Sequence, residues 1–280
     1  MPYKAPVQDM LFNMRHVANI DAVAQMPGFE DAGFDTAQAV LEECAKFNED
    51  VLAPLNWQGD INPSKWDNFE VTTTPGFKEA FKQYGAAGWQ GLQHPTEFGG
   101  QGLPLAVNQC FYEMLNSANQ AWTMYPGLTH GAYEALHAHG TPEQQATYLH
   151  KMVSGEWTGT MCLTEPHCGT DLGMMRAKAE PQADGTYMIT GNKIFISSGE
   201  HDLADNIVHL VLARLPDAPS GSKGISLFVV PKFNINADGS LGERNPIFCS
   251  GLEHKMGING NATCQMTLDG AVGTMVGKPN

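Results

Sequence analysis

The chain has 280 residues, of which 42% are hydrophobic and 16% are charged, the composition of a globular protein that can bury a core. Its formal net charge of −14 leaves no surplus of basic side chains for a phosphodiester backbone and argues against general nucleic-acid binding. A small anionic ligand stays compatible with this charge, because it needs only a few local cations and helix N-termini. The length favours two packed units over one.

The six cysteines form no CxxC pair and no dense framework, which is typical of thiols in a reducing compartment. The first fourteen residues are too polar and too interrupted by proline for a signal peptide. No apolar run approaches membrane-spanning length. We therefore expect a cytoplasmic protein.

Helical periodicity dominates the first half of the chain. From Asp35 to Leu52 apolar residues recur at helical spacing, with Asp35 and Gln38 placed as a capping box and Pro54 as a stop. A second helix is predicted over residues 74–85, where aromatic residues recur at steps of four and three.

Three more helices are predicted after a glycine-rich loop at residues 98–102. Two of them cover residues 105–115 and 131–139. The third begins at Thr141, which is followed by proline at the first helical position and glutamine at the third, and it ends at Gly155. Residues up to about Gly155 therefore form an all-helical unit.

The pattern then changes to short runs that are rich in β-branched and aromatic residues and separated by Gly, Asn, Asp and Pro, which predict an antiparallel sheet or small barrel. These runs are residues 187–190, 193–196, 207–213, 225–230 and 264–268. The expected architecture is α+β, with an N-terminal extension (1–34), an α-helical domain (35–157) and a middle β domain (158–280). Clefts commonly form where two such units meet.

Residues 162–174, with the sequence CLTEPHCGTDLGM, link the two halves. Thr164 offers a hydroxyl, Pro166 stiffens the turn, and Gly169 and Thr170 permit close backbone approach and present donors. Such a loop suits a planar, acceptor-rich ligand edge or a phosphate. It is equally compatible with a tight turn that binds nothing.

Three motifs in this order resemble those of the acyl-CoA dehydrogenase family. They are HPTEFGGQG at residues 94–102, TEPHCGTD at 164–171 and ITGNKIFISSG at 189–199. The last residues, MVGKPN at 275–280, are similar to the family's exit from its β domain, and EHKMGI at 253–258 resembles the longer subgroup that carries an extra N-terminal segment. Together the motifs are far more specific than any one of them, and we identify the chain as a member of this family.

In this family the loop that carries the second motif, residues 164–171 here, lines the pyrimidine side of the flavin of FAD and the thioester end of the substrate. The resemblance implies that Met161, Leu163 and Thr164 face this edge with main-chain and hydroxyl hydrogen bonds. It places Gly169 and Thr170 near the flavin pyrophosphate or the acyl-CoA.

The resemblance further implies that Phe195, where the family often has Trp, packs against the flavin ring. Ser197 replaces a frequent Thr near N5, the atom that receives hydride. Donors at N1, O2 and N5 stabilise the negative charge of reduced flavin. Cys168 and Met174 stand where the family usually has small residues. These departures leave the acyl chain length that the enzyme prefers undetermined.

Neighbouring histidines and cysteines are not expected to bind metal. His130, His137 and His139 lie in one helical stretch without a second group of matched ligands. The 165–168 segment, which contains Glu, His and Cys, is better explained by its place in the flavin loop.

No catalytic residue is assigned within the chain. Glu165 is expected to organise the loop, as in the family, rather than act as a base. The family's base is a Glu of the C-terminal helical domain, and no residue here matches its motif. Four other polar residues are expected in loops or on the domain surface, and these are Glu97, Glu200, His201 and His254.

The function implied by the resemblance is FAD-dependent α,β-desaturation of an acyl-CoA thioester in fatty-acid metabolism, with electrons passed to an electron-transferring flavoprotein. The parent protein is expected to be a homo-oligomer, a dimer or a tetramer. The chain itself is expected to be a fragment that lacks the C-terminal bundle, binds FAD weakly and does not turn over. Two alternatives stay open: an oxygen-using flavoenzyme, such as an acyl-CoA oxidase or a monooxygenase, and a non-catalytic interaction protein.

Overall fold

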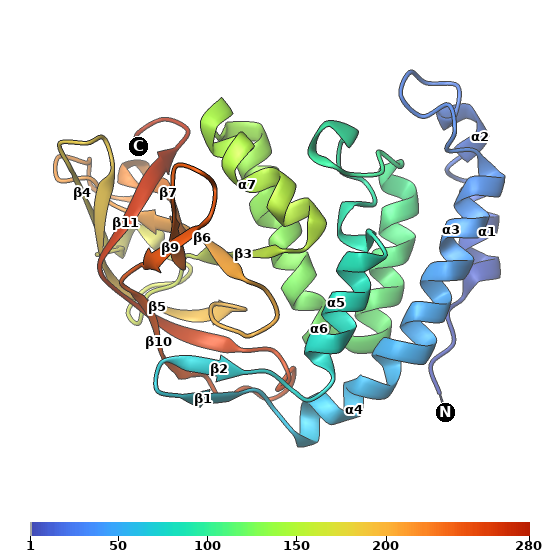
Figure 1. The fold of residues 1–280 in the computed structure, drawn as a ribbon, viewed down its shortest axis with the longest axis horizontal. Helices are drawn as coiled ribbons and strands as arrows, with labels where there is room; N and C mark the ends of the chain where they lie inside the picture. Colours follow the sequence, from blue (N-terminus) through green and yellow to red (C-terminus); the bar gives the residue numbers. More distant parts are fainter. Residues whose placement is uncertain (1) are drawn as a thin grey trace.

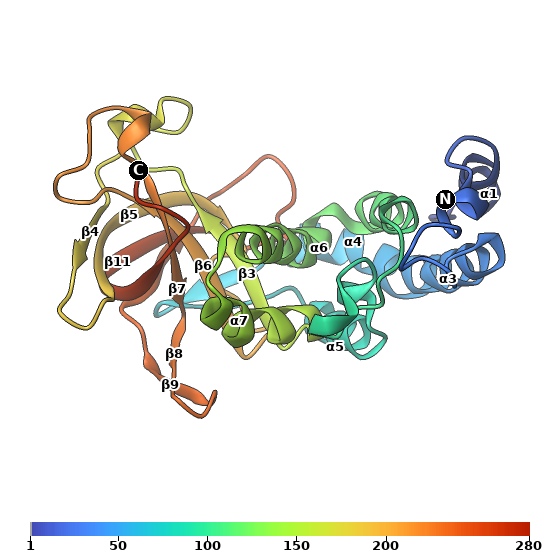
Figure 2. The same ribbon diagram turned by 90° about the horizontal axis from the view of Figure 1, so that it is seen from above.

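A computed structural model describes residues 2–280 and places a helical half beside a sheet half (Figure 1). Seen from above, the helices extend away from the sheet, with α1 and α3 at the far end (Figure 2). The α+β class predicted from the sequence is confirmed.

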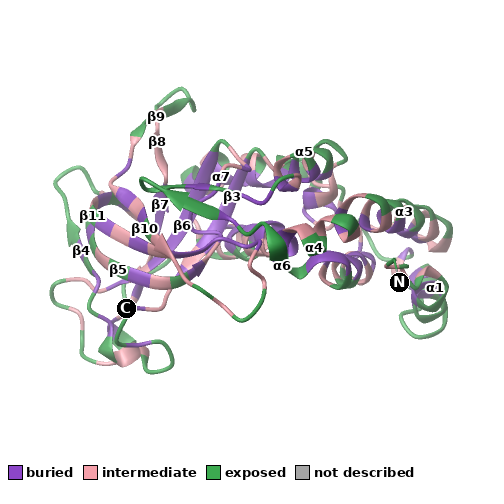
Figure 3. Ribbon diagram, turned by 90° about the horizontal axis from the view of Figure 1, so that it is seen from below, coloured by how far each residue is buried: buried purple, intermediate pink, exposed green. Residues whose placement is uncertain are grey.

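The N-terminal segment contains two helices that the sequence pattern did not reveal. They are α1 (Val7–His16) and α2 (Ile20–Val23). Met10, Leu11 and Met14 of α1 are buried in the core of the helical half. Figure 3 shows the buried stripe of this end facing inward and its exposed residues facing outward, as expected for an amphipathic helix.

The helix predicted from Asp35 begins close to that residue, as α3 (Phe34–Phe47), but the predicted capping box is wrong, since the N-cap is Gly33 and the Phe34 N–H donates to Asp21 Oδ1 at 3.0 Å. The stop at Pro54 is also wrong. The chain continues through a π-helical turn (Asn48–Leu52) into α4 (Ala53–Ile61). Pro54 lies in the first turn of α4, where the missing N–H of proline is tolerated.

After α5 (Phe77–Ala86), the two helices expected over 105–115 and 131–139 form one long helix, α6 (Leu105–His139). The two expected helices are the two segments of α6, which a kink at Asn119 separates, but the second segment begins well before residue 131. At Asn119 the backbone leaves helical geometry, with φ −159° and ψ 87°, and its Oδ1 accepts a hydrogen bond from the Trp122 N–H at 3.0 Å. Although α6 is long, no helix among residues 2–280 is both long and apolar enough to cross a membrane.

The capping box of α7 (Pro142–Ser154) is confirmed. The Gln144 N–H donates to Thr141 Oγ1 at 3.3 Å, and the Thr141 N–H donates to Gln144 Oε1 at 3.0 Å. Gly155 ends the helix with φ +79°, as expected for glycine at this position.

The main sheet has the strand order β3-β6-β7-β11-β5-β4, and β10 pairs with β11. The strands of this sheet are β3 (Trp157–Cys162), β4 (Lys178–Pro181), β5 (Tyr187–Ser197), β6 (Asn206–Ala213), β7 (Ser226–Pro231), β10 (Ile247–Leu252) and β11 (Thr263–Val276). Two hairpins lie outside it, β1 (Lys65–Asp67) with β2 (Glu70–Thr72), and β8 (Phe233–Ile235) with β9 (Leu241–Arg244).

The sheet is antiparallel, as predicted, except that β3 and β6 are parallel. The runs expected as two strands at 187–190 and 193–196 are one continuous strand, β5. The chain after β3 returns to the end of β5. The Ile194 N–H donates to the Thr164 carbonyl at 2.8 Å, and Thr160 Oγ1 donates to the Ser197 carbonyl at 2.6 Å. The sheet therefore curls toward a barrel, and this curl brings the loop after β3 against β5.

Polar contacts join the two halves. The phenol of Tyr125 on α6 donates to the Gly260 carbonyl at 3.3 Å and accepts from the Ala262 N–H at 3.0 Å. Trp66 of the β1–β2 hairpin donates through Nε1 to the Cys249 carbonyl at 2.8 Å, and the hairpin lies along β10 in Figure 1. The helical half thus covers an edge strand of the sheet, which would otherwise expose unpaired backbone groups.

The α7 cap gives a test of this local structure. Thr141→Ala removes the hydroxyl acceptor, and we expect it to lower the free energy of unfolding by about 1 kcal/mol in urea denaturation. Thr147→Ala, at a half-buried position within the same helix, is the matched control and should not destabilise the protein, because Ala is the better helix former. Equal losses in both variants would contradict the capping role.

Candidate functional site

The loop that follows β3 and the end of β5 lie side by side and form one surface of the candidate site. We call this surface the wall. Leu163 and Thr164 follow β3 directly, and Thr164 is bonded to β5 through the Ile194 N–H. Gly169 lies over Thr164, so close that a Cβ added there would sit 3.3 Å from the Thr164 Cγ2. The structure therefore brings Thr164 and Gly169 together beside β5, which carries Phe195.

The remaining site residues named from the sequence lie along the same segments. Met161 is half-buried in β3, Ser197 is half-buried at the end of β5, and Thr170 is exposed where the loop leaves the wall. No predicted cofactor-binding residue is isolated from this region of the fold.

The wall contains hydrogen-bond donors that have no protein acceptor. Within residues 2–280, neither the N–H nor the hydroxyl of Thr164 donates to a protein group, and the Ser197 hydroxyl also has no protein partner. Phe195 has φ +56°, a conformation that is uncommon for an aromatic residue, and its side chain is 52% exposed. An exposed ring beside free donors fits a planar ligand with acceptor atoms at its edge.

A buried ion pair connects the two segments that form this wall. Lys193 is fully buried and donates through Nζ to Glu165 Oε1 at 2.9 Å and to the Leu163 carbonyl at 3.1 Å. Glu165, which is 3% exposed, also accepts from the backbone N–H groups of Arg176 at 2.7 Å and Ala177 at 3.0 Å. One pair of charges therefore connects β5, the loop and the segment that leads into β4.

The charge state of Glu165 follows from these contacts. Burial by itself raises the pKa of the carboxyl, but the hydrogen bonds from the Arg176 N–H and the Lys193 ammonium outweigh it and hold the pKa below its ordinary value. The carboxylate stays ionised and fully engaged. This arrangement supports a loop-organising role for Glu165 and leaves it no position from which to act as a base.

Glu165, His167 and Cys168 lie close enough together to suggest a metal centre. His167 Nε2, however, is bonded to the Met174 carbonyl at 2.9 Å and lies 3.5 Å from Glu165 Oε2. Because the Glu165 oxygens already accept three hydrogen bonds from Lys193, Arg176 and Ala177, this cluster is better described as an ion pair with its neighbours than as a ligand set.

Glu200 corrects an expectation from the sequence. It lies in a loop, one of the two places expected, but it is buried to 1% exposure and not at the surface. Lys232 and Arg244 compensate its charge, the latter with Nη2 at 2.9 Å from Oε2. Burial of a carboxylate requires such partners, and they lie far along the chain, so the sequence pattern did not show them.

His201 was also expected in a loop or at the surface, and it too is 1% exposed. Its Nδ1 accepts from the Leu203 N–H at 3.2 Å, which leaves Nε2–H to donate to Thr158 Oγ1 at 2.9 Å. Burial, with the neighbouring Lys232 charge, lowers the pKa of His201 well below its ordinary value. The ring is therefore a neutral core residue with a fixed tautomer.

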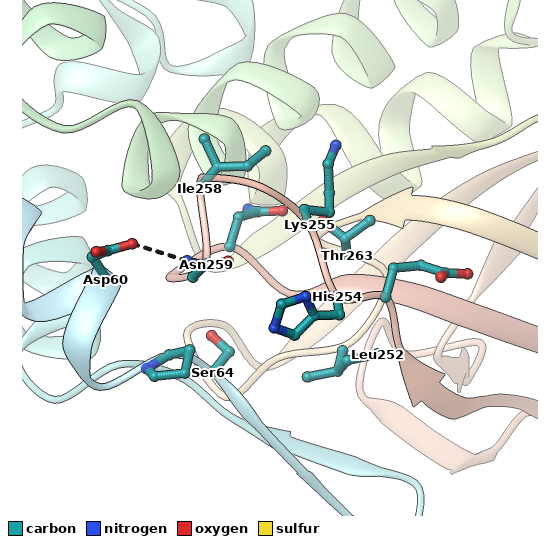
Figure 4. Close-up of a pocket in the computed structure, with 11 residues that line it drawn as sticks. Asp60, Ser64, Leu252, His254, Lys255, Ile258, Asn259 and Thr263 are labelled. Atoms are coloured by element: carbon teal, nitrogen blue, oxygen red, sulfur yellow. Dashed lines mark hydrogen bonds between the residues drawn. The ribbon is translucent and has the colours of Figure 1, made fainter.

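A polar cavity of about 300 Å³ opens where the loop before β11 meets the end of α4 (Figure 4). Asn261 Oδ1 and Thr263 Oγ1 line it and are buried without a protein partner among the described residues. Thr263 pairs with Ser197 across the sheet, and Asn261 Nδ2 donates to Ser198 Oγ at 3.0 Å. The cavity therefore adjoins the strand end that carries Ser197. Sequence reasoning missed it, although the small polar run NGNAT at 259–263 was a signal.

The comparisons with known proteins agree with this fold. The chain matches the N-terminal domain of acyl-CoA dehydrogenases over residues 35–156 and their middle domain over residues 160–271. The chain belongs to the acyl-CoA dehydrogenase family, and the family predicted from the sequence motifs is confirmed.

Among curated relatives, the chain is 45% identical to 3-methylmercaptopropionyl-CoA dehydrogenase of Ruegeria pomeroyi, over 100% of this chain and 48% of that protein. It is 38% identical to the broad-specificity linear acyl-CoA dehydrogenase FadE5 of Mycobacterium tuberculosis, over 95% of this chain and 44% of that protein. The chain thus spans about half the length of these relatives.

Solved structures show the same fold. Butyryl-CoA dehydrogenase from Megasphaera elsdenii superimposes with a TM-score of 0.71 at 24% identity, over 88% of this chain and 59% of that one. An acyl-CoA dehydrogenase from Bacillus anthracis in complex with FAD gives a TM-score of 0.70 at 22% identity, over 88% and 38%.

The buried pair can be tested by removing one partner. Lys193→Met leaves Glu165 charged and buried, and we expect it to lower the free energy of unfolding by about 3–5 kcal/mol in urea denaturation. Lys4→Met, which removes a largely exposed lysine paired with Glu49, is the control and should destabilise the protein far less, because water screens an exposed ion pair. The double variant Lys193→Met, Glu165→Gln should lose less than the sum of its single variants, and strict additivity would contradict the pairing.

The buried His201 predicts a pH dependence of stability. Its folded pKa is below its unfolded value, so its contribution is complete above about pH 6.5 and is lost as the pH falls, by up to about 1.4 kcal/mol per pH unit. Urea unfolding at several pH values between 5 and 8 should show this loss, and His201→Asn should make the curve shallower. The exposed His139→Asn is the control, and an unchanged slope in His201→Asn would refute the assignment.

Proposed function

We propose that the protein containing this chain is an FAD-dependent acyl-CoA dehydrogenase that forms an α,β double bond in an acyl-CoA thioester. The observation that carries the proposal is the pair of free donors, Thr164 and Ser197, beside the exposed ring of Phe195. Family membership supports it, as do the names of the relatives and the FAD complex of the similar Bacillus anthracis enzyme.

The residues of the wall have separate roles in this proposal. Thr164, with the main chain of Met161 and Leu163, presents N–H and hydroxyl donors to the pyrimidine edge of the flavin. Gly169 and Thr170 lie next to the pyrophosphate or the acyl-CoA, where a side chain at position 169 would collide with Thr164.

The end of β5 completes the wall in this proposal. Phe195 packs its ring against the flavin, and the Ser197 hydroxyl holds the edge that contains N5. Bound FAD would supply the acceptor for the hydride from the β-carbon. Donors fixed in advance at this edge stabilise the charge of the reduced ring without reorganisation.

The rest of the site is proposed to lie outside residues 1–280, because the chain spans about half of its relatives. A Glu elsewhere in the protein would remove the α-proton, and a homo-oligomer passing electrons to an electron-transferring flavoprotein in the cytoplasm would complete the system. Residues 1–280 alone should bind FAD weakly and not turn over, and stoichiometric flavin with turnover by these residues alone would contradict this.

The test uses the full-length protein. Thr164→Val and Ser197→Ala should each weaken FAD binding, measured by quenching of flavin fluorescence, by roughly fivefold, the value of one hydrogen bond of about 1 kcal/mol. Thr190→Val, an exposed position on the same strand β5, is the matched control and should leave FAD affinity unchanged. Absence of FAD from the wild-type protein, or equal affinities in all variants, would reject the proposed wall.

A further inference from the structure

A second cluster of side chains lies outside the proposed flavin wall. His94 belongs to the segment before the glycine-rich loop, while His130 and Glu134 lie one turn apart on α6. Glu134 Oε1 is 3.7 Å from His94 Nδ1 and 3.8 Å from His130 Nδ1, and His130 Nδ1 is 3.4 Å from His94 Nε2. Three metal-ligating groups therefore converge from two distant segments of the chain.

His94 is unsatisfied in this cluster. It is 1% exposed, and among residues 2–280 its Nδ1 has no hydrogen-bond partner. If Nδ1 carries the proton, the nearest acceptor, on Glu134, is beyond hydrogen-bond distance. If Nε2 carries it, a bare lone pair on Nδ1 faces the carboxylate. Both tautomers leave a buried nitrogen unpaired, which costs free energy, and a cation between the two groups would remove that cost.

The glycine-rich loop holds His94 in place. The Gly102 N–H donates to the His94 carbonyl at 2.9 Å, and Gly100 packs so tightly that an added Cβ would lie 2.0 Å from that carbonyl oxygen. The ring of Tyr133 on α6 lies 3.8 Å from the His94 ring, between centroids. The imidazole is thus positioned before any ligand arrives, as a binding site requires.

The chemistry of the three groups suits a transition metal. Two imidazoles and one carboxylate are a ligand set that zinc-type ions take in proteins, and His94, His130 and Glu134 supply it. Bonds of about 2.1 Å in a tetrahedral site put ligand atoms roughly 3.4 Å apart. Glu134 Oε1 lies 3.7 Å from His94 Nδ1 and 3.8 Å from His130 Nδ1, so these two ligand pairs need only a small contraction to reach that geometry.

We propose that His94, His130 and Glu134 bind a divalent transition metal of the zinc type, with the fourth position open to water. The metal fastens the glycine-rich loop to α6. Glu134 is 49% exposed and His130 32% exposed, which gives the ion a path from solvent. His130 also lines a cavity of about 160 Å³ together with Gln93. The sequence predicted no metal here because the α6 histidines lacked a second group of ligands, and folding supplies that group through His94.

The test uses Co²⁺ as a visible substitute for zinc, with the full-length protein freed of any polyhistidine tag. We expect one equivalent of Co²⁺ to give d–d absorption bands of a four- or five-coordinate site, and Zn²⁺ to displace it. Loss of a ligand should weaken binding by more than about tenfold, the lower end of the cost of losing an outer-shell partner. Glu134→Gln and His130→Gln should show this loss.

His139→Gln changes an exposed histidine at the end of the same helix and is the matched control, which should retain wild-type affinity. Zn²⁺ should also raise the thermal midpoint of the wild type and of His139→Gln, but not that of Glu134→Gln. No stoichiometric Co²⁺ spectrum, or equal Co²⁺ affinity in the wild type, Glu134→Gln and His130→Gln, would overturn the proposal.

Discussion

The buried ion pair between Lys193 and Glu165 is the contact on which the proposed flavin wall depends. Neither charge reaches solvent, and each hydrogen bond of the pair fixes a different segment. Burial of two charges is costly unless all their polar atoms are engaged. The pair is therefore weak evidence of net stability. It is strong evidence that only one arrangement of β3, the loop and β5 satisfies both groups.

Other buried polar groups in the sheet half are also satisfied by specific partners. Glu200 is enclosed by Lys232 and Arg244, and His201 is held as a neutral ring by one donor and one acceptor. Tyr125 then connects the helical half to the start of β11 through backbone groups. Each of these buried polar groups is thus satisfied by partners from other segments of the chain.

Local sequence patterns predicted much of the secondary structure. They failed where contacts between distant residues determine the structure. The cap at Thr141 depends on neighbours three residues away, and it was predicted correctly. The start of the second segment of α6 was not, because residues 120–130 include Pro126 and are held in the helix by packing, which overrides the local pattern. The β1–β2 hairpin was missed because its strands are short and exposed, with only Val71 buried, so they carry little hydrophobic periodicity.

The sequence by itself determined the class of fold, the family and the residues named for the wall, because motifs at fixed spacing encode backbone geometry that few residue types can adopt. Only the tertiary structure decided that Glu200 and His201 are core residues, that β3 runs parallel to β6, and that His94 meets His130 and Glu134. Each of these depends on groups that are far apart in the chain and are brought into contact by the packing of one half on the other.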